Sequence, residues 1–277
     1  MNSNWDYKNG NDNKAILYNV IGVKNKELFP HARARGGNNL NPRGPNGATG
    51  LELVIINNDM YESTVGLKIS LQTRNLTIPF CNSYLFSQII GHLLGDGCLV
   101  LSWSSKNPYF VFTQGFLRFR YAWFVFNNIS FLCKSMPRLG KSNRKGKISW
   151  NIQILTRSYP FLKELYIDFY IKDVNNKWIK IVPPEMYDWL NPIVMAYWAM
   201  DDGGNTSSGT GFYLHTNGFD FNSVYYLAGI IHYKFNIICT VQNHENRPVL
   251  YITAQSKSKF IEMIRPYFHD SLLYKLQ

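Results

Sequence analysis

Two aspartates in this sequence, Asp96 and Asp202, stand in similar surroundings, because each follows an apolar stretch and precedes glycine. The two stretches read Ile89-Ile-Gly-His-Leu-Leu-Gly-Asp-Gly97 and Met195-Ala-Tyr-Trp-Ala-Met-Asp-Asp-Gly203. Carboxylate oxygens suit Mg²⁺, which commonly binds one or two carboxylates together with the phosphates of a substrate. If the two aspartates lie together, they predict a magnesium site that hydrolyses a phosphodiester with metal-activated water.

Either motif alone is also typical of an ordinary helix end, because Gly supplies a left-handed cap and Asp begins a turn. The two motifs nevertheless occur at matching points of two similar segments. This pairing favours a shared acidic site over two unrelated helix ends.

Each aspartate is expected at the C-terminus of a helix. Ser83 is a suitable N-cap for the first helix, and Asn191 followed by Pro192 is a suitable start for the second. A helix C-terminus carries partial negative charge, so two aspartates there destabilise each other unless a positive group lies between them. Small residues three or four apart would let the two helices approach closely: Gly91, Gly95, Ala196 and Ala199.

The segments after the two aspartates contain the same order of predicted elements, which indicates an internal duplication. Each aspartate is followed by a strand, a helix, a second strand, a second helix and a lysine. These are 109–114, 119–131, 148–155, 160–169 and Lys180 in the first half, and 211–217, 221–235, 249–253, 257–267 and Lys275 in the second. We therefore divide the chain into an N-terminal extension or linker (1–82), a first half (83–185) and a second half (186–277), with the pseudo-twofold symmetry of a fused dimer.

The basic composition predicts an anionic partner such as nucleic acid. Among 277 residues, 29 Lys and Arg against 18 Asp and Glu give a net charge of +11. From residue 83 onward, 20 bases against 12 acids leave +8, so most of the excess lies in the duplicated part. The four cysteines lie apart without zinc spacing, and no apolar stretch is long enough for a membrane span. Sequence motifs of Ser/His/Asp and Cys/His nucleophiles, of P-loops and of dinucleotide sites are absent.

The two aspartate stretches resemble the two degenerate LAGLIDADG motifs of a single-chain homing endonuclease, or meganuclease. The likeness extends from about residue 82 to the C-terminus, and it is greatest with mitochondrial intron-encoded endonucleases. It rests on 196–204, on the Lys180-Ile-Val-Pro stretch and on the terminal Tyr274-Lys-Leu276. His92 and Trp198 stand where the family usually has leucine. The resemblance implies an α+β fold of two αββαββα halves, whose antiparallel sheets form a saddle on double-stranded DNA.

The resemblance also implies roles for residues of the site. In this family the last acidic residue of each motif binds metal, so Asp96 and Asp202 would share two or more Mg²⁺ ions. A polar residue at the end of an early strand and a lysine near the end of each half organise the catalytic water. By position these residues are Gln114, Asn217, Lys180 and Lys275. Asp201 stands where the family needs no carboxylate, and we treat it as secondary.

Six basic residues without an intervening acid lie between two strand-like segments of the first half: Lys134, Arg138, Lys141, Arg144, Lys145 and Lys147. A run of charge is often only a solvated face. In a sheet connection of a basic protein, it favours contact with DNA phosphates. Arg118 and Arg120 have two equal interpretations, DNA contact or snorkelling from an amphipathic element.

The resemblance therefore implies a monomeric, site-specific, metal-dependent DNA endonuclease that cuts both strands and promotes intron homing. The N-terminus has no targeting signal, so the protein is expected either in the cytosol or in the compartment where it is made. The resemblance to mitochondrial intron-encoded endonucleases implies that it is encoded and made in the mitochondrion. Two alternatives stay open. One is an RNA maturase that binds intron RNA and assists splicing of its host group I intron, and the other is a DNA-binding protein without catalytic activity.

Overall fold

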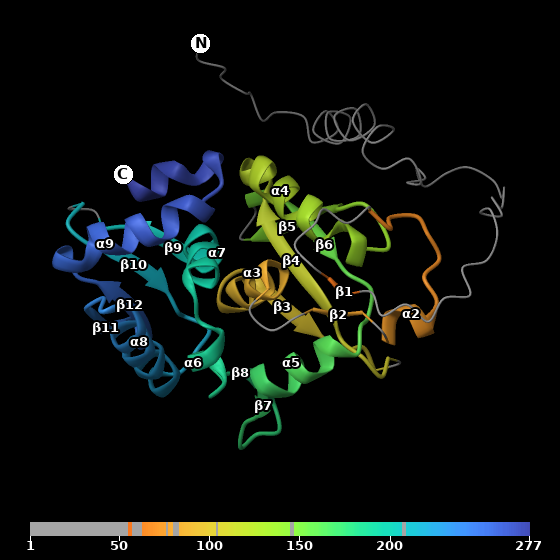
Figure 1. Cartoon of the computed structure of the whole chain (residues 1–277), viewed down its shortest axis with the longest axis horizontal. Coiled ribbons are helices and arrows are strands. Elements are labelled where there is room, and N and C mark those ends of the chain that lie inside the picture. Colours follow the sequence, from red (N-terminus) through yellow and green to blue (C-terminus); the bar gives the residue numbers. More distant parts are fainter. Residues whose placement is uncertain are drawn as a thin grey trace, which may run out of the picture.

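The computed structural model describes residues 55–56, 63–75, 77–79, 83–103, 105–144, 147–206 and 209–277. One order of elements occurs twice, helix, two strands, helix, two strands, helix, as Figure 1 shows. The first half contains α3 (Tyr84–Leu94), β3 (Gly97–Val100), β4 (Tyr109–Gly115), α4 (Phe119–Ile129), β5 (Arg138–Arg144), β6 (Lys147–Leu155) and α5 (Phe161–Phe169). The second half contains α7 (Pro192–Asp202), β9 (Gly203–Asn205), β10 (Phe212–His215), α8 (Phe221–Phe235), β11 (Cys239–His244), β12 (Arg247–Ile252) and α9 (Ala254–Ile264).

Short elements flank and connect the two halves. Before α3 lie β1 (Ile55–Ile56), α2 (Leu71–Asn75) and β2 (Ile78–Pro79), and between α5 and α7 lie β7 (Tyr170–Lys172), β8 (Trp178–Lys180) and α6 (Met186–Trp189). Single turns of 3₁₀ helix are η1 (Phe116–Arg118), η2 (Ser130–Leu132) and η3 (Arg265–Tyr267), and a longer one, η4 (Asp270–Leu276), ends the chain.

The two four-stranded sheets are antiparallel and have the same strand order, β3-β4-β6-β5 in the first half and β9-β10-β12-β11 in the second. Their registers also correspond, because Gly97 pairs with Phe112 in one sheet and Gly203 pairs with Leu214 in the other. The predicted α+β class and the predicted repeat of elements are confirmed. Each sheet begins directly after the helix that bears an aspartate.

Both helices that precede the sheets begin at the predicted caps. The Ser83 side chain accepts a hydrogen bond from the backbone N–H of Phe86, and Asn191 accepts from Ile193 and Val194. Pro192 stands in the first turn of α7, where its missing N–H costs nothing. Nearly every residue of the two helices is buried, and no helix in the described part of the chain is long and apolar enough to cross a membrane.

Helices α3 and α7 pack against each other at the centre of the molecule, between the two sheets (Figure 1). The approach is close because Gly91 has no side chain: a Cβ there would lie 2.6 Å from Tyr197 Cβ and 2.7 Å from the Val194 carbonyl oxygen. A Cβ on Gly95 would lie 2.5 Å from Asp201 Cβ. The first half of the predicted small-residue contact is therefore confirmed, and it sets how closely the two helix ends meet.

The second half of that prediction was wrong, because Ala196 and Ala199 do not face Gly91 and Gly95. The contacting residues of α7 include Val194 and Asp201, and each alanine lies two residues from one of them, about 200° round the helix. Both alanines are fully buried on the side of α7 away from α3. The α3 glycines therefore receive large side chains of α7 instead of opposing small ones.

The predicted basic run includes a strand, which corrects its interpretation as a sheet connection. Its middle part is β5, an edge strand whose few apolar residues do not show the alternation that identifies a half-buried strand. Successive side chains of a strand point to opposite faces, so Arg138 and Lys141 cannot share one face. Arg138 is exposed opposite Gln153, whereas the Lys141 ammonium lies 5.8 Å from the centre of the Trp150 ring.

Residues 63–67, within the predicted N-terminal extension, are docked on the first half. Val65 is buried in the core, and the Arg157 guanidinium donates hydrogen bonds to the carbonyl oxygens of Thr64 (2.9 Å) and Leu67 (2.9 Å). The same guanidinium also donates to the Cys133 carbonyl oxygen at 2.6 Å. At least this segment therefore packs with the first half, while residues 1–54 lie outside the described part of the chain.

Candidate active site

The ends of α3 and α7 bring Asp96 and Asp202 into one electrostatic site. Desolvation raises the pKa of the Asp202 carboxyl to about 7, and the next largest causes are the negative charges of Asp96 and Asp201. Asp96 itself is exposed to solvent, but desolvation by the surrounding protein, followed by the charge of Asp201, raises its pKa to about 6. The Asp96 N–H also donates to the side chain of Asp201, which precedes Asp202, so the two aspartates lie near each other as expected. A bound cation would relieve the repulsion that Asp96 exerts on Asp202.

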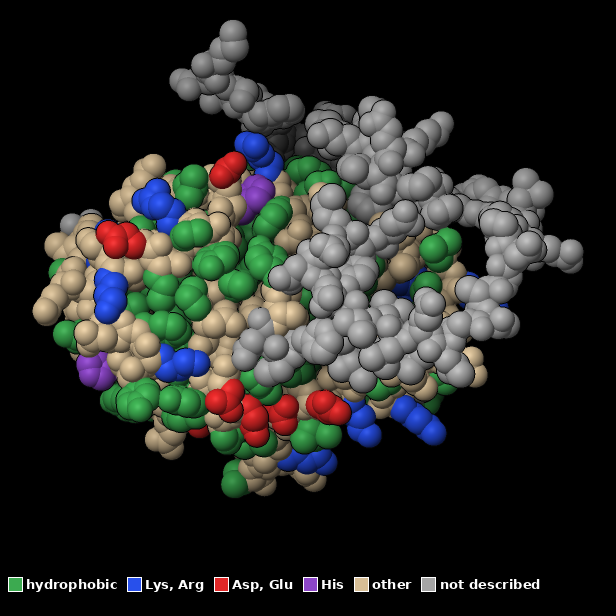
Figure 2. All heavy atoms as spheres, viewed as in Figure 1, with side chains coloured by type: hydrophobic (Ala, Val, Ile, Leu, Met, Phe, Trp, Pro, Cys, Tyr) green, Lys and Arg blue, Asp and Glu red, His purple; other side chains and the backbone are tan. Residues whose placement is uncertain are grey.

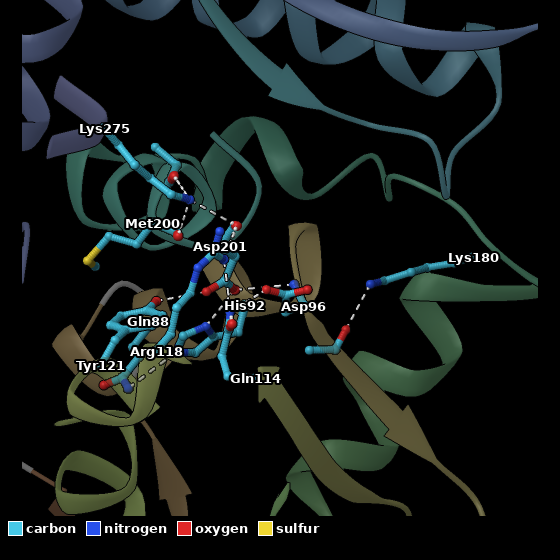
Figure 3. Close-up of polar contacts among 12 residues, drawn as sticks. Gln88, His92, Asp96, Gln114, Arg118, Tyr121, Lys180, Met200, Asp201 and Lys275 are labelled. Carbon is cyan, nitrogen blue, oxygen red and sulfur yellow. Dashed lines mark hydrogen bonds and ion pairs between the residues drawn. The ribbon is translucent and has the colours of Figure 1, made fainter. Parts of the chain in front are cut away.

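A buried polar network centred on Asp201 joins the two helices (Figure 3). Asp201 is 3% exposed, and its Oδ2 accepts hydrogen bonds from His92 Nδ1 (2.8 Å) and from the backbone N–H of Asp96 (3.2 Å). Its Oδ1 accepts from the Tyr121 hydroxyl at 2.7 Å. Gln88 Nε2 lies 3.5 Å from the other ring nitrogen of His92. Asp201 therefore links three elements, α3, α4 and the α3–β3 turn.

Gln114 and Arg118 complete the first half of the site. Gln114 is buried at the end of β4, and its Nε2 donates to Asp96 Oδ2 at 2.5 Å. Arg118 Nη1 lies 3.5 Å from Gln114 Oε1 and 3.4 Å from the Asp201 carbonyl oxygen. Its positive charge lowers the pKa of Asp96, against the larger effect of desolvation. These distances place Arg118 within the site, a contact that neither interpretation of Arg118, DNA contact or snorkelling, included.

The two predicted lysines lie at the helix ends. Lys275 is buried, and its Nζ donates to the Met200 (2.6 Å) and Asp201 (3.1 Å) carbonyl oxygens at the C-terminal end of α7, where its positive charge is favourable. Lys180 Nζ donates to the Gly97 carbonyl oxygen at 3.0 Å. Desolvation lowers the pKa of both ammonium groups to about 8, and both lower the pKa of Asp202. The lysines thus provide part of the positive charge expected between the helix ends.

The position equivalent to Gln114 in the second half is Thr216, which corrects the assignment of Asn217 by position. Gln114 lies two residues beyond the Gly97 partner Phe112, and Thr216 lies two residues beyond the Gly203 partner Leu214. The Thr216 hydroxyl is buried and donates to the Pro248 carbonyl oxygen at 2.6 Å. Asn217 is exposed in the turn that follows β10. Its role as an organiser of water stays a prediction.

The donor set is compatible with a divalent metal ion but is incomplete by itself. Among the described residues, no three or more His, Cys, Asp and Glu side chains form a group that could hold a metal ion. Two accessible carboxylates of raised pKa nevertheless match the Mg²⁺ ion, which takes few protein carboxylates and completes its coordination with water and substrate phosphates. A metal at this site would therefore depend on a phosphate-bearing ligand.

The raised pKa values predict that the metal-free protein becomes less stable as the pH rises from 5 to 8. Both carboxyls have an ordinary pKa of 3.8, so between about pH 4 and pH 7 the folded state binds more protons than the unfolded state. Their stabilising contribution is present at low pH and is lost as the pH passes about 6 for Asp96 and about 7 for Asp202.

Melting temperatures recorded in EDTA from pH 5 to 8 test this dependence, because Asp202→Asn should flatten the fall relative to the wild type. Parallel curves for the two proteins would contradict the assignment of the shift to Asp202. Addition of Mg²⁺ at pH 8 with a DNA duplex should restore part of the stability, since a ligand that binds the folded state stabilises it.

The outward faces of the two sheets differ in chemistry. In the first sheet, Thr113 and Arg138 both pair with Gln153 on the face opposite the buried Phe112 and Ile154. The outward face of the second sheet carries the following side chains: Tyr213, His215, Gln242, His244 and Tyr251. The first surface is polar, whereas the second is aromatic and rich in histidine. Both carry a guanidinium, because the exposed Arg247 pairs with His244.

The other residues of the basic run differ in their position relative to β5 and β6. Lys134 is exposed before β5, Arg144 and Lys147 pair at the end of the β5–β6 hairpin, and Lys145 lies outside the described residues.

Figure 2 shows that Asp and Glu side chains gather along the lower edge of the molecule in this view, in the region of α5 and α6 in Figure 1. Helix α5 carries Glu164 and Asp168, α6 carries Asp188, and Glu185 is the N-cap residue of α6. Desolvation, followed by the charges of Glu185 and Glu164, raises the pKa of Asp168. That edge is unfavourable for phosphates.

Sequence reasoning did not identify the network formed by His92, Tyr121, Arg118 and Asp201. One signal was present: a histidine replaces an apolar residue in the first motif, and an acid is added at the end of the second. A buried polar residue in an apolar helix requires a partner. Only the packing of α3 against α7 shows that these two exceptions are each other's partners.

Comparison with known proteins places this geometry in context. The chain matches the model of the LAGLIDADG DNA endonuclease family over residues 86–260, a range that contains both aspartates and both sheets. It is similar to the homing endonuclease I-WcaI bound to its DNA recognition sequence, with a TM-score of 0.64 and 24% identity over 70% of this chain and 86% of that chain. This structural likeness supports the fold.

Two curated proteins extend the comparison. The chain is 31% identical over 158 residues to the intron-encoded endonuclease ai4 of Dictyostelium discoideum, which covers 54% of this chain and 95% of that protein. It is also 31% identical over 232 residues to the cytochrome b mRNA maturase bI2 of Saccharomyces cerevisiae, 80% of this chain and 53% of that protein. The chain therefore spans about half the length of the yeast relative.

Proposed function

Because the chain belongs to the LAGLIDADG DNA endonuclease family, we propose that it is a site-specific endonuclease that cuts both strands of DNA with a divalent metal and promotes intron homing. The observation that carries this proposal is that Asp96 and Asp202 lie together at the ends of two packed helices. The Asp96 N–H donates to Asp201, the neighbour of Asp202, and the charge of Asp96 helps to raise the pKa of Asp202. A structural scaffold gains nothing from two desolvated carboxylates of like charge. A cation and a phosphodiester would compensate both.

Asp96 and Asp202 would hold the metal ions, of which Mg²⁺ is the proposed one and two or more are shared. When bound, the metal supplies Lewis acidity and a hydroxide nucleophile near neutral pH. Gln114 fixes the Asp96 carboxylate through its amide and organises the attacking water. In the second half, Asn217 is the proposed organiser of water, although it lies one residue beyond Thr216, the counterpart of Gln114 in strand register.

Lys180 and Lys275 supply positive charge where the scissile phosphates would accumulate negative charge. Their pKa values of about 8 mean that both remain mostly protonated at pH 7. Nζ of Lys275 donates to a carbonyl oxygen at the end of α7, and Nζ of Lys180 donates to the carbonyl oxygen of Gly97, the first residue of β3. Each positive charge is therefore fixed before the substrate arrives. Such pre-organised charges need little reorganisation during the reaction.

DNA would lie across the outward faces of the two sheets, as a double-stranded target that one monomer contacts with both halves. The similar I-WcaI structure is bound to its DNA recognition sequence. Arg138, together with Gln153 and Thr113, presents donors and acceptors that can read base edges in the major groove. Lys134, Arg144, Lys145 and Lys147 are proposed to contact phosphates, which supplies affinity without sequence preference. Lys141, the other member of the run, lies on the opposite face of β5 against Trp150.

The test is cleavage of an intronless DNA that spans the insertion site of the host intron. The protein should convert this DNA into two fragments in Mg²⁺ and leave it intact in EDTA. A duplex interrupted by the intron at the same site is the matched control and should not be cut. Binding of the intronless duplex without any cleavage in Mg²⁺ or Mn²⁺ would contradict the proposed activity.

A second candidate function is maturase activity on intron RNA. The supporting observation is that relatives named as cytochrome b mRNA maturases match 80% and 69% of this chain. Because these relatives are named after the cytochrome b mRNA, we also propose a mitochondrial origin for this chain. Splicing of a precursor RNA that contains the host intron should then accelerate on addition of the protein, and it should do so equally with Asp202→Asn. Acceleration of splicing without DNA cleavage would make this the principal function.

A further inference from the structure

We propose that Asp201 is a positioning residue, contributed by the second half of the chain, that fixes the metal-binding loop of the first half by holding the backbone N–H of Asp96. The inference rests on the proposed endonuclease function for its catalytic consequence, but its structural part stands independently. Nothing in the motif pattern assigns a role to this acid, because the metal-binding position is the next residue, Asp202.

The side chain of Asp201 points into the interface between α3 and α7. Asp201 is buried, whereas Asp96 is exposed and Asp202 is partly exposed, so Asp201 is the least accessible of the three carboxylates. Both of its oxygens are occupied by protein donors, Oδ1 by the Tyr121 hydroxyl and Oδ2 by His92 Nδ1 and the Asp96 N–H. With three donors in place, this side chain has little remaining capacity to coordinate a metal ion.

The first half could not carry an equivalent acid. The sheet registers make Gly95 the counterpart of Asp201, since Gly97 and Gly203 begin their strands at matching points. A Cβ on Gly95 would approach Asp201 Oδ2 to 2.8 Å and Asp201 Cβ to 2.5 Å. The space between Gly95 and Asp201 therefore holds only one carboxylate side chain. The contact is therefore asymmetric: the second half positions the loop of the first half.

The role of this contact follows from where Asp96 lies. Helix α3 ends at Leu94, so Asp96 belongs to a two-residue turn before β3 and has no helical hydrogen bond to fix it. Its carboxylate is held by Gln114, and its backbone is held by Asp201. Partners that orient metal ligands commonly affect metal affinity or activity by about 10- to 100-fold. Loss of the Asp201 oxygens should release the backbone and lower metal affinity without removing a ligand.

Two substitutions separate positioning from metal coordination. In Asp201→Asn the amide oxygen can still accept from His92 and from the Asp96 N–H, while its NH₂ can donate to the Tyr121 oxygen. Asp201→Ala removes every acceptor. If Asp201 positions Asp96 through hydrogen bonds, the Asn variant should lie within about 3-fold of the wild type, whereas the Ala variant should lose about 10- to 100-fold.

The first measurement needs neither metal nor DNA. Hydrogen exchange of the Asp96 backbone amide, followed by NMR in the metal-free protein, should accelerate about 10- to 100-fold in Asp201→Ala and change little in Asp201→Asn. The second measurement is the Mn²⁺ concentration for half-maximal binding in the DNA complex, which should rise by a similar factor in Asp201→Ala. Single-turnover cleavage is the third, and it should follow the metal affinity.

Asp220 provides a matched control because its carboxylate caps α8 in the same half, accepting from the Ser223 N–H at 2.7 Å. Asp220→Ala should cost about 0.5 to 2 kcal/mol of stability through the lost cap, yet leave exchange at Asp96 unchanged. If Asp201→Ala does not fold, Tyr121→Phe serves instead. It removes a single donor to Asp201, and Asp96 exchange should rise more than in Asp220→Ala.

The outcomes distinguish this inference from the proposed function. Loss of metal binding in Asp201→Asn as large as in Asp201→Ala would overturn positioning and make the charge of Asp201 the essential property. Unchanged exchange at Asp96 in Asp201→Ala would also overturn it. If the wild type fails to cut DNA while Asp96 exchange responds as expected, the endonuclease proposal fails and the positioning contact stands.

Discussion

Asp202→Asn should abolish double-strand cleavage while leaving the protein folded and able to bind DNA. Loss of a metal ligand removes several kcal/mol of transition-state stabilisation, and each 1.4 kcal/mol is a factor of ten. We therefore expect the cleavage rate to fall by roughly 10³-fold or more. The same substitution removes a desolvated carboxyl whose pKa is raised to about 7. Activity and stability should therefore change in opposite directions, since the metal-free variant should melt no lower than the wild type at pH 8.

Single-turnover cleavage in Mg²⁺ and melting in EDTA, measured on the same preparation, check this pair of effects. Asp96→Asn should behave similarly in cleavage, although its carboxylate is more exposed and its gain in stability should be smaller. Asp220→Asn, which changes a carboxylate in the α8 cap, is the control that should retain cleavage. A lower melting temperature together with lost cleavage in Asp202→Asn would attribute the loss to unfolding and contradict the metal-ligand role.

Gly91→Ala should strongly destabilise the packing of α3 against α7. The added Cβ would lie 2.6 Å from Tyr197 Cβ and 2.7 Å from the Val194 carbonyl oxygen, so the α7 backbone itself must move. Overpacking of this kind costs about 1 to 3 kcal/mol or more, which corresponds to a fall in melting temperature of about 2 to 12 °C for a chain of this size.

The cleavage rate of this variant should fall by more than its loss of folded protein explains. The reason is that the spacing of α3 and α7 sets the distance between the two carboxylates. Gly229→Ala is the matched control: Gly229 is exposed in the interior of α8, and an added Cβ would meet nothing within 4 Å. That change should stabilise the protein by about 0.5 to 1 kcal/mol. Equal melting temperatures for the two alanine variants would mean that α3 and α7 do not pack as closely as described.

The helices that bear the aspartates could be predicted because their signals are local. Ser83 and Asn191 are strong N-caps, Pro192 favours a first turn, and glycine follows each aspartate. Strand β5 could not be predicted in the same way, because an edge strand with polar residues on both faces has no alternation to detect. Local patterns identify elements that bury one face, and they fail where an element is stabilised chiefly by backbone pairing.

Site residues divide along the same line. Asp96 was predictable from its motif, and Gln114, Lys180 and Lys275 were implied by the family resemblance. The structure brings all four near the ends of α3 and α7. The assignment of Asn217 failed by one residue, since sequence spacing does not reveal strand register. The register of β10 depends on its pairing with β9 and β12. This register makes Thr216 the residue of the second half that is equivalent to Gln114 in the first half.

The amino-acid sequence by itself determined the duplication, the two capped helices, the basic body and the two aspartates that follow them, because each is written in contiguous residues. Only the tertiary structure decided what compensates those charges. His92 and Asp201 are 109 positions apart, and they form a buried pair because Gly91 and Gly95 let α7 approach α3 closely. Electrostatic energy depends on distance in space and on desolvation, and neither quantity can be read from residue order.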